Sequence, residues 1–150
     1  MEISFRVDGL QHLQKKLETI KNLERDPRVN QALGRGAARI QAQVKLLTPK
    51  GTTGNLQNKI ISQQSKFMEW VVETNVEYAI FVEFGTGKLG DPAVPHTSKD
   101  SWTYYSDELK RFVTTHGQEP AAMFRTGFDL AHKQAFCIVE TEVKEIIRHG

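Results

Sequence analysis

The sequence predicts an α+β fold, in which an antiparallel β-sheet packs against two long helices and one shorter helix. Apolar residues recur at steps of three and four over residues 29–47 and again over residues 124–147, as on helices with one buried face. Residues 67–74 alternate between apolar and polar side chains, which is typical of a half-buried strand. Residues 86–119 are polar and rich in turn formers, so we expect a long loop insertion that carries a β-hairpin. The chain of 150 residues is expected to form one domain, residues 1–150.

The first two elements are expected to be a strand and an amphipathic helix. Glu2–Val7 alternates strictly and has its apolar residues on one side: Ile3, Phe5 and Val7. The helix that follows is indicated by one apolar stripe: Leu10, Leu13, Leu17 and Ile20. Asp8 can cap this helix, because its carboxylate can accept hydrogen bonds from the free N–H groups of the first turn.

The second helix is predicted over Val29–Leu47, where apolar residues keep the helical spacing throughout. It contains Gly34 and Gly36, and each mid-helix glycine costs about 1 kcal/mol relative to alanine. The close approach of a neighbouring backbone, or a kink, would explain them. Thr48 precedes a proline and should end the helix, because proline disfavours helical geometry in the residue before it.

The middle of the chain is predicted to form two strands and a short helical turn. Leu56–Ser62 and Phe67–Thr74 are expected to pair antiparallel through a connection at Gln63–Lys66. Tyr78–Phe84 fits either a buried strand or a short helix, and the spacing of its aromatic residues favours the helix. Within the long insertion, Trp102–Tyr105 and Arg111–Thr115 are expected to form the hairpin.

The last helix is expected to begin with Pro120, because proline suits the first helical position. Its buried stripe should comprise Phe124, Phe128, Ala131, Ala135, Ile138, Val139, Val143, Ile146 and Ile147. Cys137 lies among apolar residues and is expected to be a buried, inert thiol.

Composition and charge narrow the class of protein. The net charge is +2, but residues 1–50 carry ten Lys/Arg and five Asp/Glu (+5), whereas residues 51–150 carry ten and thirteen (−3). This polarity suits head-to-tail contacts between copies or one face near a polyanion. The sequence shows no leader pattern and no apolar run long enough for a membrane span, so we expect a protein that folds in a reducing cytoplasm, with no membrane partner.

No enzyme signature is found in the sequence. Gly85–Gly90 resembles a phosphate-binding loop, but only one residue, instead of four, separates its first glycine from the Gly-Lys pair. The lysine is followed by leucine instead of serine or threonine. The five histidines lack the spacing of zinc ligands. Glu77 and Glu83 border an apolar element, where they can accept hydrogen bonds at its ends. We therefore expect no catalytic residues, no metal and no cofactor, and a small hydrolase stays the weakest hypothesis.

An alternative function is suggested by basic residues on the second helix. Arg28, Arg35, Arg39 and Lys45 lie largely off its apolar stripe, so they could face a DNA channel or another polyanion and neutralise phosphates without reading sequence. The same pattern is found on ordinary solvated helices. The alternative is therefore a small nucleic-acid-binding domain that uses residues 28–45.

Four sequence segments in a fixed order resemble one protein family. They are Pro49 with Thr53–Leu56, Tyr78–Thr86, Trp102–Tyr104 and Gly117–Phe124. This order is similar to that of the bacteriophage neck and tail-completion proteins known as the HK-ninety-seven gene-ten-like family. Thr126 stands where many members have proline, so one constraint on entry into the last helix is missing.

The resemblance implies a non-enzymatic structural protein of the virion, located in the neck or tail region. Copies would form a homo-oligomeric ring that helps to join head to tail around the DNA channel. The implied partners are the protein itself and the adjoining portal or adaptor, head-closure, tail-terminator or tail-tube proteins, with non-specific contact to phage DNA.

Subunit or partner contacts are expected mainly on the long insertion and on the family segments. The expected contact residues are Thr53, Gly54, Asn55, Glu83, Gly85, Thr86, Trp102, Tyr104, Tyr105 and Phe112. We also expect Thr86–Glu119 to be mobile in the free protomer and to become ordered when it docks on a neighbouring subunit or ring.

Overall fold

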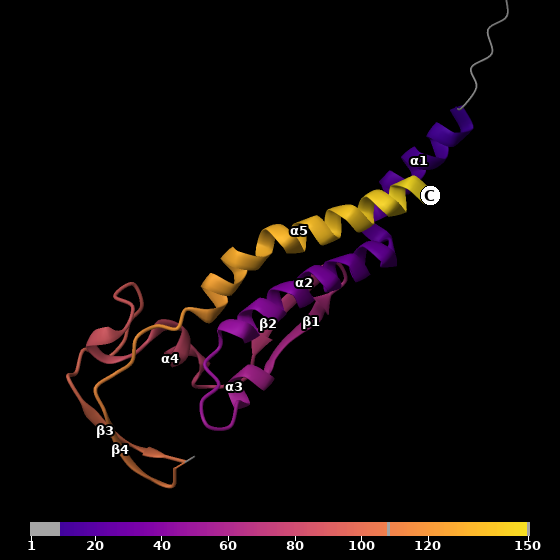
Figure 1. The fold of residues 1–150 in the computed structure, drawn as a ribbon. Coiled ribbons are helices and arrows are strands. Elements are labelled where there is room, and N and C mark those ends of the chain that lie inside the picture. The colour runs from indigo at the N-terminus through magenta and orange to yellow at the C-terminus, as the bar shows by residue number, and fades with distance from the viewer. Residues whose placement is uncertain (1–9, 108, 150) are drawn as a thin grey trace, which may run out of the picture. The chain divides into compact units, whose positions relative to one another are not determined.

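The computed structural model describes residues 10–107 and 109–149, which divide into two compact units. Unit 1 contains residues 10–39, 62–72 and 132–149, and unit 2 contains residues 40–61, 73–107 and 109–131. Four elements contribute residues to both units (Figure 1): α2 (Pro27–Leu47), β1 (Ile60–Lys66), β2 (Glu69–Thr74) and α5 (Met123–His149). The predicted α+β class is confirmed, although the described strands form two separate two-stranded sheets. The assignment of the chain to one domain stays a prediction.

Unit 1 begins with α1 (Leu10–Asn22) and a short 3-10 helix, η1 (Leu23–Arg25). Asp26 then starts α2, because its carboxylate accepts the backbone N–H of Arg28 at 2.8 Å. Pro27 occupies the first helical position, where proline is tolerated because an N–H at that position would have no acceptor within the helix. Both predicted helices are confirmed, whereas the strand predicted over Glu2–Val7 and the cap at Asp8 lie outside the described residues.

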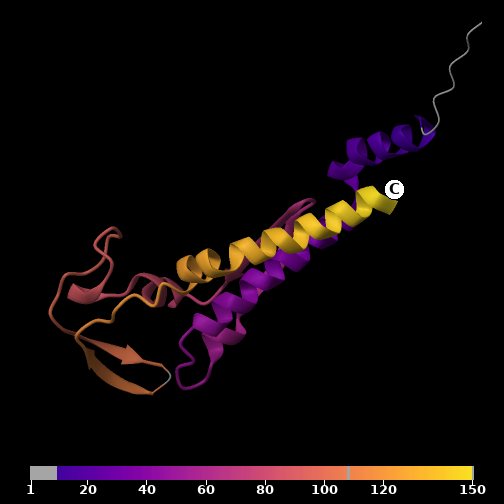
Figure 2. The ribbon, with the colours of Figure 1, turned by 45° about the horizontal axis from the view of Figure 1, so that its top comes forward.

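The glycines of α2 allow close approach within unit 1. A Cβ atom on Gly34 would lie 2.7 Å from a ring carbon of Trp70, and the indole N–H of Trp70 donates to the carbonyl oxygen of Asn30 at 3.1 Å. A Cβ on Gly36 would lie 3.3 Å from the carbonyl oxygen of Ala135 on α5. The later part of α5 lies beside the first part of α2 in both views (Figure 2). Close approach of a neighbouring element therefore explains both glycines.

The β1–β2 hairpin turns at Phe67–Met68, with Met68 in the left-handed region at φ 65°. The backbone N–H of Met68 donates to the side-chain oxygen of Asn30 at 3.0 Å, which supports this unusual conformation. The predicted connection at Gln63–Lys66 is wrong, because these residues belong to β1. The two-residue turn could not be predicted from the sequence, because neither phenylalanine nor methionine is a usual turn former.

Unit 2 contains the end of α2, the beginning of α5 and five complete elements that precede or form the long loop. These are α3 (Asn55–Asn58), α4 (Ala79–Phe84), the 3-10 helix η2 (Gly87–Leu89) and the hairpin of β3 (Trp102–Ser106) with β4 (Arg111–Thr115). The hairpin pairs Trp102 with Thr115 and Ser106 with Arg111. The predictions of α4 as a helix and of the β3–β4 hairpin are confirmed.

The core of unit 2 is small and is formed largely by Val44, Leu56, Ile60, Ala79, Met123 and Ala131. Gly127 lets α5 approach α2 here, because a Cβ on it would lie 3.0 Å from the Cα of Val44. The strand predicted over Leu56–Ser62 is wrong in its first half. Leu56 lies in a helical turn that buries it, and Gln57 donates to the carbonyl oxygen of Lys45 at 2.7 Å.

Three predictions about α5 are wrong. The helix begins at Met123 and not at Pro120, because Ala122 has a positive φ of 46° and its N–H donates to α4 instead of entering the helix. Phe128 is exposed, since its neighbour Gly127 is the residue that contacts α2. Cys137 is also exposed, because it lies two residues from the buried Ala135 and so about 200° around the helix.

Among residues 10–107 and 109–149, no helix combines the length and apolarity needed to cross a bilayer. The same part of the chain contains no group of three or more His, Cys, Asp or Glu side chains arranged to hold a metal ion.

Candidate interaction surface

The long loop, residues 86–119, is closed at its base by a short antiparallel bridge within unit 2. The N–H of Thr86 donates to the carbonyl oxygen of Gln118 at 2.9 Å, and the N–H of Gln118 donates back to Thr86 at 3.2 Å. Glycines with positive φ flank the bridge at Gly85 and Gly117. A Cβ on Gly85 would lie 2.6 Å from the carbonyl oxygen of Gln118, and one on Gly117 would collide with Thr86. The bridge therefore requires glycine at both positions.

Glu83 connects α4 to the first turn of α5. Its buried carboxylate accepts the backbone N–H of Phe124 at 2.9 Å and that of Arg125 at 3.2 Å. These N–H groups belong to the first helical turn, where a helix has no partners of its own. A negative charge here also interacts favourably with the positive end of the helix dipole. Glu83 therefore caps α5 from a distant position in the sequence.

Arg125 extends this contact to the start of the long loop. Its guanidinium donates to Glu83 at 3.3 Å and to Asp91 at 2.7 Å, and it lies 5.0 Å from the centre of the Phe84 ring. The N–H of Ala93, followed by the Arg125 guanidinium, lowers the pKa of Asp91 below its usual value. Asp91 therefore stays ionised near neutral pH and joins the long loop to α5.

Backbone bonds complete the base of the long loop. Ala121 and Ala122 donate to the carbonyl oxygens of Val82 and Glu83, at 2.8 and 3.1 Å. The side-chain amide of Gln118 donates to the carbonyl oxygen of Phe81 at 2.6 Å. These carbonyls belong to the last turn of α4, where they would otherwise lack hydrogen-bond donors. We call Glu83–Thr86, Asp91 and Gln118–Arg125 together the loop root.

The β3–β4 hairpin displays aromatic side chains. Tyr105 and Phe112 face each other across the strands and stack edge to face, with ring centres 5.3 Å apart. Phe112 is 73% exposed, and Tyr104 and Tyr105 are also exposed. Trp102 differs, because its half-buried ring lies beside Gly87, 3.1 Å from where a Cβ on that glycine would be. Three of the four predicted aromatic contact residues therefore lie on an accessible surface.

The other predicted contact residues lie at the start of α3. The hydroxyl of Thr53 accepts the N–H of Asn55 at 3.3 Å, and Gly54 has a positive φ of 65°. The side-chain amide of Asn55 donates to the hydroxyl of Tyr78 at 3.5 Å, a long contact. Tyr78 begins an exposed apolar face of α4 that also includes Ile80 and Phe81. The structure thus brings Asn55 next to exposed residues of the family segment Tyr78–Thr86 that were not among the predicted contact residues.

Comparison with protein families gives one match. Residues 11–85, half of the chain, match the model of a family described as "Bacteriophage HK97-gp10, putative tail-component". The chain belongs to the HK97-gp10-like family. Comparisons with curated proteins and with solved structures gave no match.

Membership of the HK97-gp10-like family indicates a structural role as a phage tail component, which points to a virion protein and away from an enzyme. The matched range ends at Gly85, so it includes Glu83 of the loop root. It excludes the long loop, the hairpin and α5. The family resemblance of Trp102–Tyr104 and Gly117–Phe124 therefore stays a prediction.

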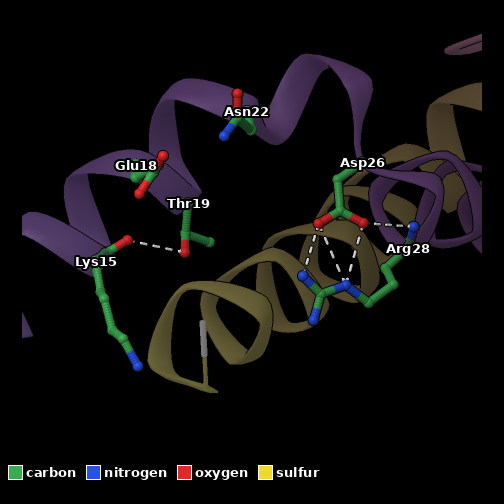
Figure 3. Close-up of a pocket in the computed structure, with 6 residues that line it drawn as sticks. All are labelled: Lys15, Glu18, Thr19, Asn22, Asp26 and Arg28. Carbon is green, nitrogen blue, oxygen red and sulfur yellow. Dashed lines mark hydrogen bonds and ion pairs between the residues drawn. The ribbon is translucent and has the colours of Figure 1, made fainter.

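Three of the four basic residues predicted to face DNA have partners within unit 1. Arg28 forms an ion pair with Asp26 at 2.7 Å (Figure 3). Their hydrogen bond favours the charged form of both side chains, so the pKa of Asp26 is lowered and the pKa of Arg28 is raised. Arg35 is paired with Glu142, whose pKa it lowers, and Arg39 donates to Gln134 at 2.7 Å. Lys45, in unit 2, is half-buried. An arginine paired with a carboxylate has less charge to offer a phosphate, and a DNA-facing role stays a prediction.

The ion pair between Asp26 and Arg28 lines a depression of about 330 Å³, and Figure 3 draws the residues around it. It is lined by Lys15, Glu18, Thr19, Asn22, Asp26 and Arg28. Its charges are mixed, and the Thr19 hydroxyl already donates to the carbonyl oxygen of Lys15 at 3.1 Å. The depression therefore lacks the convergent polar groups of a ligand site.

Sequence reasoning missed Arg125 and Asp91, and it assigned Glu83 only to a contact surface or to hydrogen bonding at the end of an apolar element. One signal was available. The first turn of α5 contains no acidic residue, so its N–H groups needed an acceptor from elsewhere in the chain. Glu83 is that acceptor, and its predicted role in subunit contacts stays a prediction.

Proposed function

We propose that this protein is a structural virion protein at the head–tail junction of a tailed phage or phage-like particle, in the neck or at the tail end. Copies form a homo-oligomeric ring around the DNA channel. The observation that carries this proposal is the match of residues 11–85 to a phage tail-component family. Its neighbours in the particle would be portal or adaptor, head-closure, tail-terminator or tail-tube proteins.

The geometry of unit 2 supports a binding role for the long loop. The loop root holds both ends of the loop through a buried carboxylate, an ion pair and backbone bonds. From this base, the hairpin presents Tyr104, Tyr105 and Phe112 to solvent. Aromatic side chains supply large contact areas in interfaces, and anchoring them in advance reduces the entropy lost on binding. The hairpin is therefore suited to a subunit or partner contact.

A ring also requires each copy to present two different surfaces, since only heterologous contacts that close by rotation form rings. The uneven charge of the chain, basic in residues 1–50 and acidic in residues 51–150, suits such head-to-tail contacts.

The proposal is tested on purified particles. Peptide mass spectrometry should detect the protein in particles, and antibody labelling should place it between head and tail. Negative-stain microscopy of the assembled protein should show rings. If the protein is absent from particles, the proposal is refuted. If the purified chain instead forms no ring and binds short duplex DNA with steep salt dependence, the nucleic-acid-binding alternative is supported.

A further inference from the structure

The apolar stripe of α1 faces solvent in the free chain. Leu13, Leu17 and Ile20 lie at steps of four and three, so they share one side of the helix. Their exposed fractions are 53%, 56% and 47%. By contrast, Thr19 on another side of the same helix is half-buried. Among the described residues, none thus covers the face of α1 that is most suited to burial.

This exposure matters because α1 has only 13 residues. Isolated helices of that length are marginal in water, and their stability in proteins comes mainly from packing of the apolar face. A cover for Leu13, Leu17 and Ile20 would therefore both bury apolar surface and stabilise the helix. Two lysines flank the stripe: Lys16 lies about 60° to one side of Leu13 and Lys21 about 80° to the other. The cover should accordingly carry negative charge at its edges.

A surface of that kind is present on unit 2. Tyr78, Ile80 and Phe81 on α4 are 45–55% exposed and form an apolar patch. Two exposed carboxylates belong to residues next to it in the chain or one residue from a bond to it: Glu77 precedes Tyr78, and Glu119 follows Gln118, whose side chain is bonded to the Phe81 carbonyl. Within the described part of the chain, neither carboxylate forms an ion pair, and neither does Lys16 or Lys21.

The two surfaces also match in length. The stripe from Leu13 to Ile20 spans seven residue steps, about 10 Å, and the six-residue helix α4 is about 9 Å long. The α1 stripe is apolar with positive charges at its edges, and the α4 patch is apolar with negative charges near it. We propose that α1 of one copy binds the α4 patch of a second copy, which is a heterologous contact between subunits. This inference rests on the proposed ring, for which it supplies a specific subunit interface.

Complementary charge reversals test the contact between copies. Variant A carries Lys16→Glu and Lys21→Glu, and variant B carries Glu77→Lys and Glu119→Lys. Each variant alone places like charges at both edges of the contact, so its self-association should weaken at least about tenfold by analytical ultracentrifugation. An equimolar mixture should regain wild-type association, because every contact in an alternating A–B assembly pairs opposite charges. Lys15→Glu is the matched control, since Lys15 lies about 160° from Leu17 and should leave association unchanged.

A second variant tests the apolar part. Leu17→Asp places a charge in the stripe and should weaken association about 100-fold. At concentrations where both proteins are monomeric, circular dichroism should give the variant the helix content of the wild type, because Leu17 is exposed in the protomer.

Four results would overturn the inference. If variants A and B associate as the wild type does, α1 and α4 are excluded from the subunit contact, while the particle location is unaffected. If the mixture fails to recover, the two surfaces do not meet in trans. If the wild-type chain stays monomeric at every concentration, or if α1 binds anionic vesicles in a Leu17-dependent way, the occupant of the stripe is not a second copy. The location of the protein in particles tests the proposed function separately.

Discussion

Replacing Glu83 tests the interpretation that a residue of α4 caps α5. In Glu83→Ala, the N–H groups of Phe124 and Arg125 lose a charged acceptor. Arg125 is exposed, so its N–H can be rehydrated, whereas Phe124 is half-buried and its N–H would be left without a partner. Loss of a cap costs about 1 kcal/mol, and an unsatisfied buried donor adds about 1–3 kcal/mol. We therefore expect a loss of about 2–4 kcal/mol in the free energy of unfolding.

The isosteric variant Glu83→Gln separates charge from hydrogen bonding. Its amide oxygen can still accept one N–H, but the interaction of a negative charge with the helix end is lost, which is worth about 0.3–1 kcal/mol. We expect a loss of about 1–2 kcal/mol, smaller than for alanine. The ion pair with Arg125 adds little, because Arg125 is about half exposed.

Urea unfolding in dilute solution measures both losses, and hydrogen exchange at Phe124 and Arg125 tests whether the first turn of α5 opens. Glu77→Ala is the control, because Glu77 is exposed and should change stability by less than about 0.5 kcal/mol. If Glu83→Ala and Glu77→Ala proved equally stable, or if the first turn of α5 kept its protection, the capping role of Glu83 would be refuted.

Three further predictions concern the long loop and the hairpin. Gly117→Ala should lower the free energy of unfolding by about 2–4 kcal/mol, because Gly117 has a positive φ and a Cβ on it would collide with the Thr86 carbonyl oxygen. The variant should also exchange the amide hydrogens of Thr86 and Gln118 faster, and an unchanged exchange rate would contradict this. The stability contributed by Asp91 should be present above its unfolded-state pKa of about 4 and be lost as the pH falls through its lower folded-state pKa, because the folded state favours the ionised form. Asp91→Asn should therefore flatten the acid limb of a stability–pH curve, and an unaltered limb would exclude this role. Phe112→Ser should leave unfolding of the protomer within about 1 kcal/mol of wild type, since Phe112 is mostly exposed, yet reduce ring assembly; normal assembly by Phe112→Ser would exclude the hairpin from the interface.

Elements with a clear local signal were predictable from the sequence. Regular apolar spacing located α1 and α2, and alternating residues between turn formers located the β3–β4 hairpin. Thr48-Pro49 also gave the end of α2 correctly. In these cases, the residues that define the element are neighbours in the chain, so pattern and structure agree.

Features that depend on distant residues were not predictable in this way. The start of α5 is set by Glu83, about 40 residues earlier, and the hairpin turn at Met68 is supported by Asn30, 38 residues earlier. The exposure of Cys137 depends on which side of α5 meets α2, and Gly36 with Ala135 decides that side. Within the candidate surface, Tyr104, Tyr105 and Phe112 are exposed as a contact role requires, and that role stays a prediction, but nothing local indicated that Trp102 would be half-buried.

The packing of Trp70 against Gly34 makes the protein a convenient subject for spectroscopy. The chain has two tryptophans, Trp70 in unit 1 and Trp102 in unit 2. In a Trp102→Phe variant, fluorescence would report only on the indole that is hydrogen-bonded to Asn30. In a Trp70→Phe variant, it would report only on the ring beside Gly87. Melting curves that coincide would show that the two units unfold together, and separate midpoints would assign each transition to its own unit.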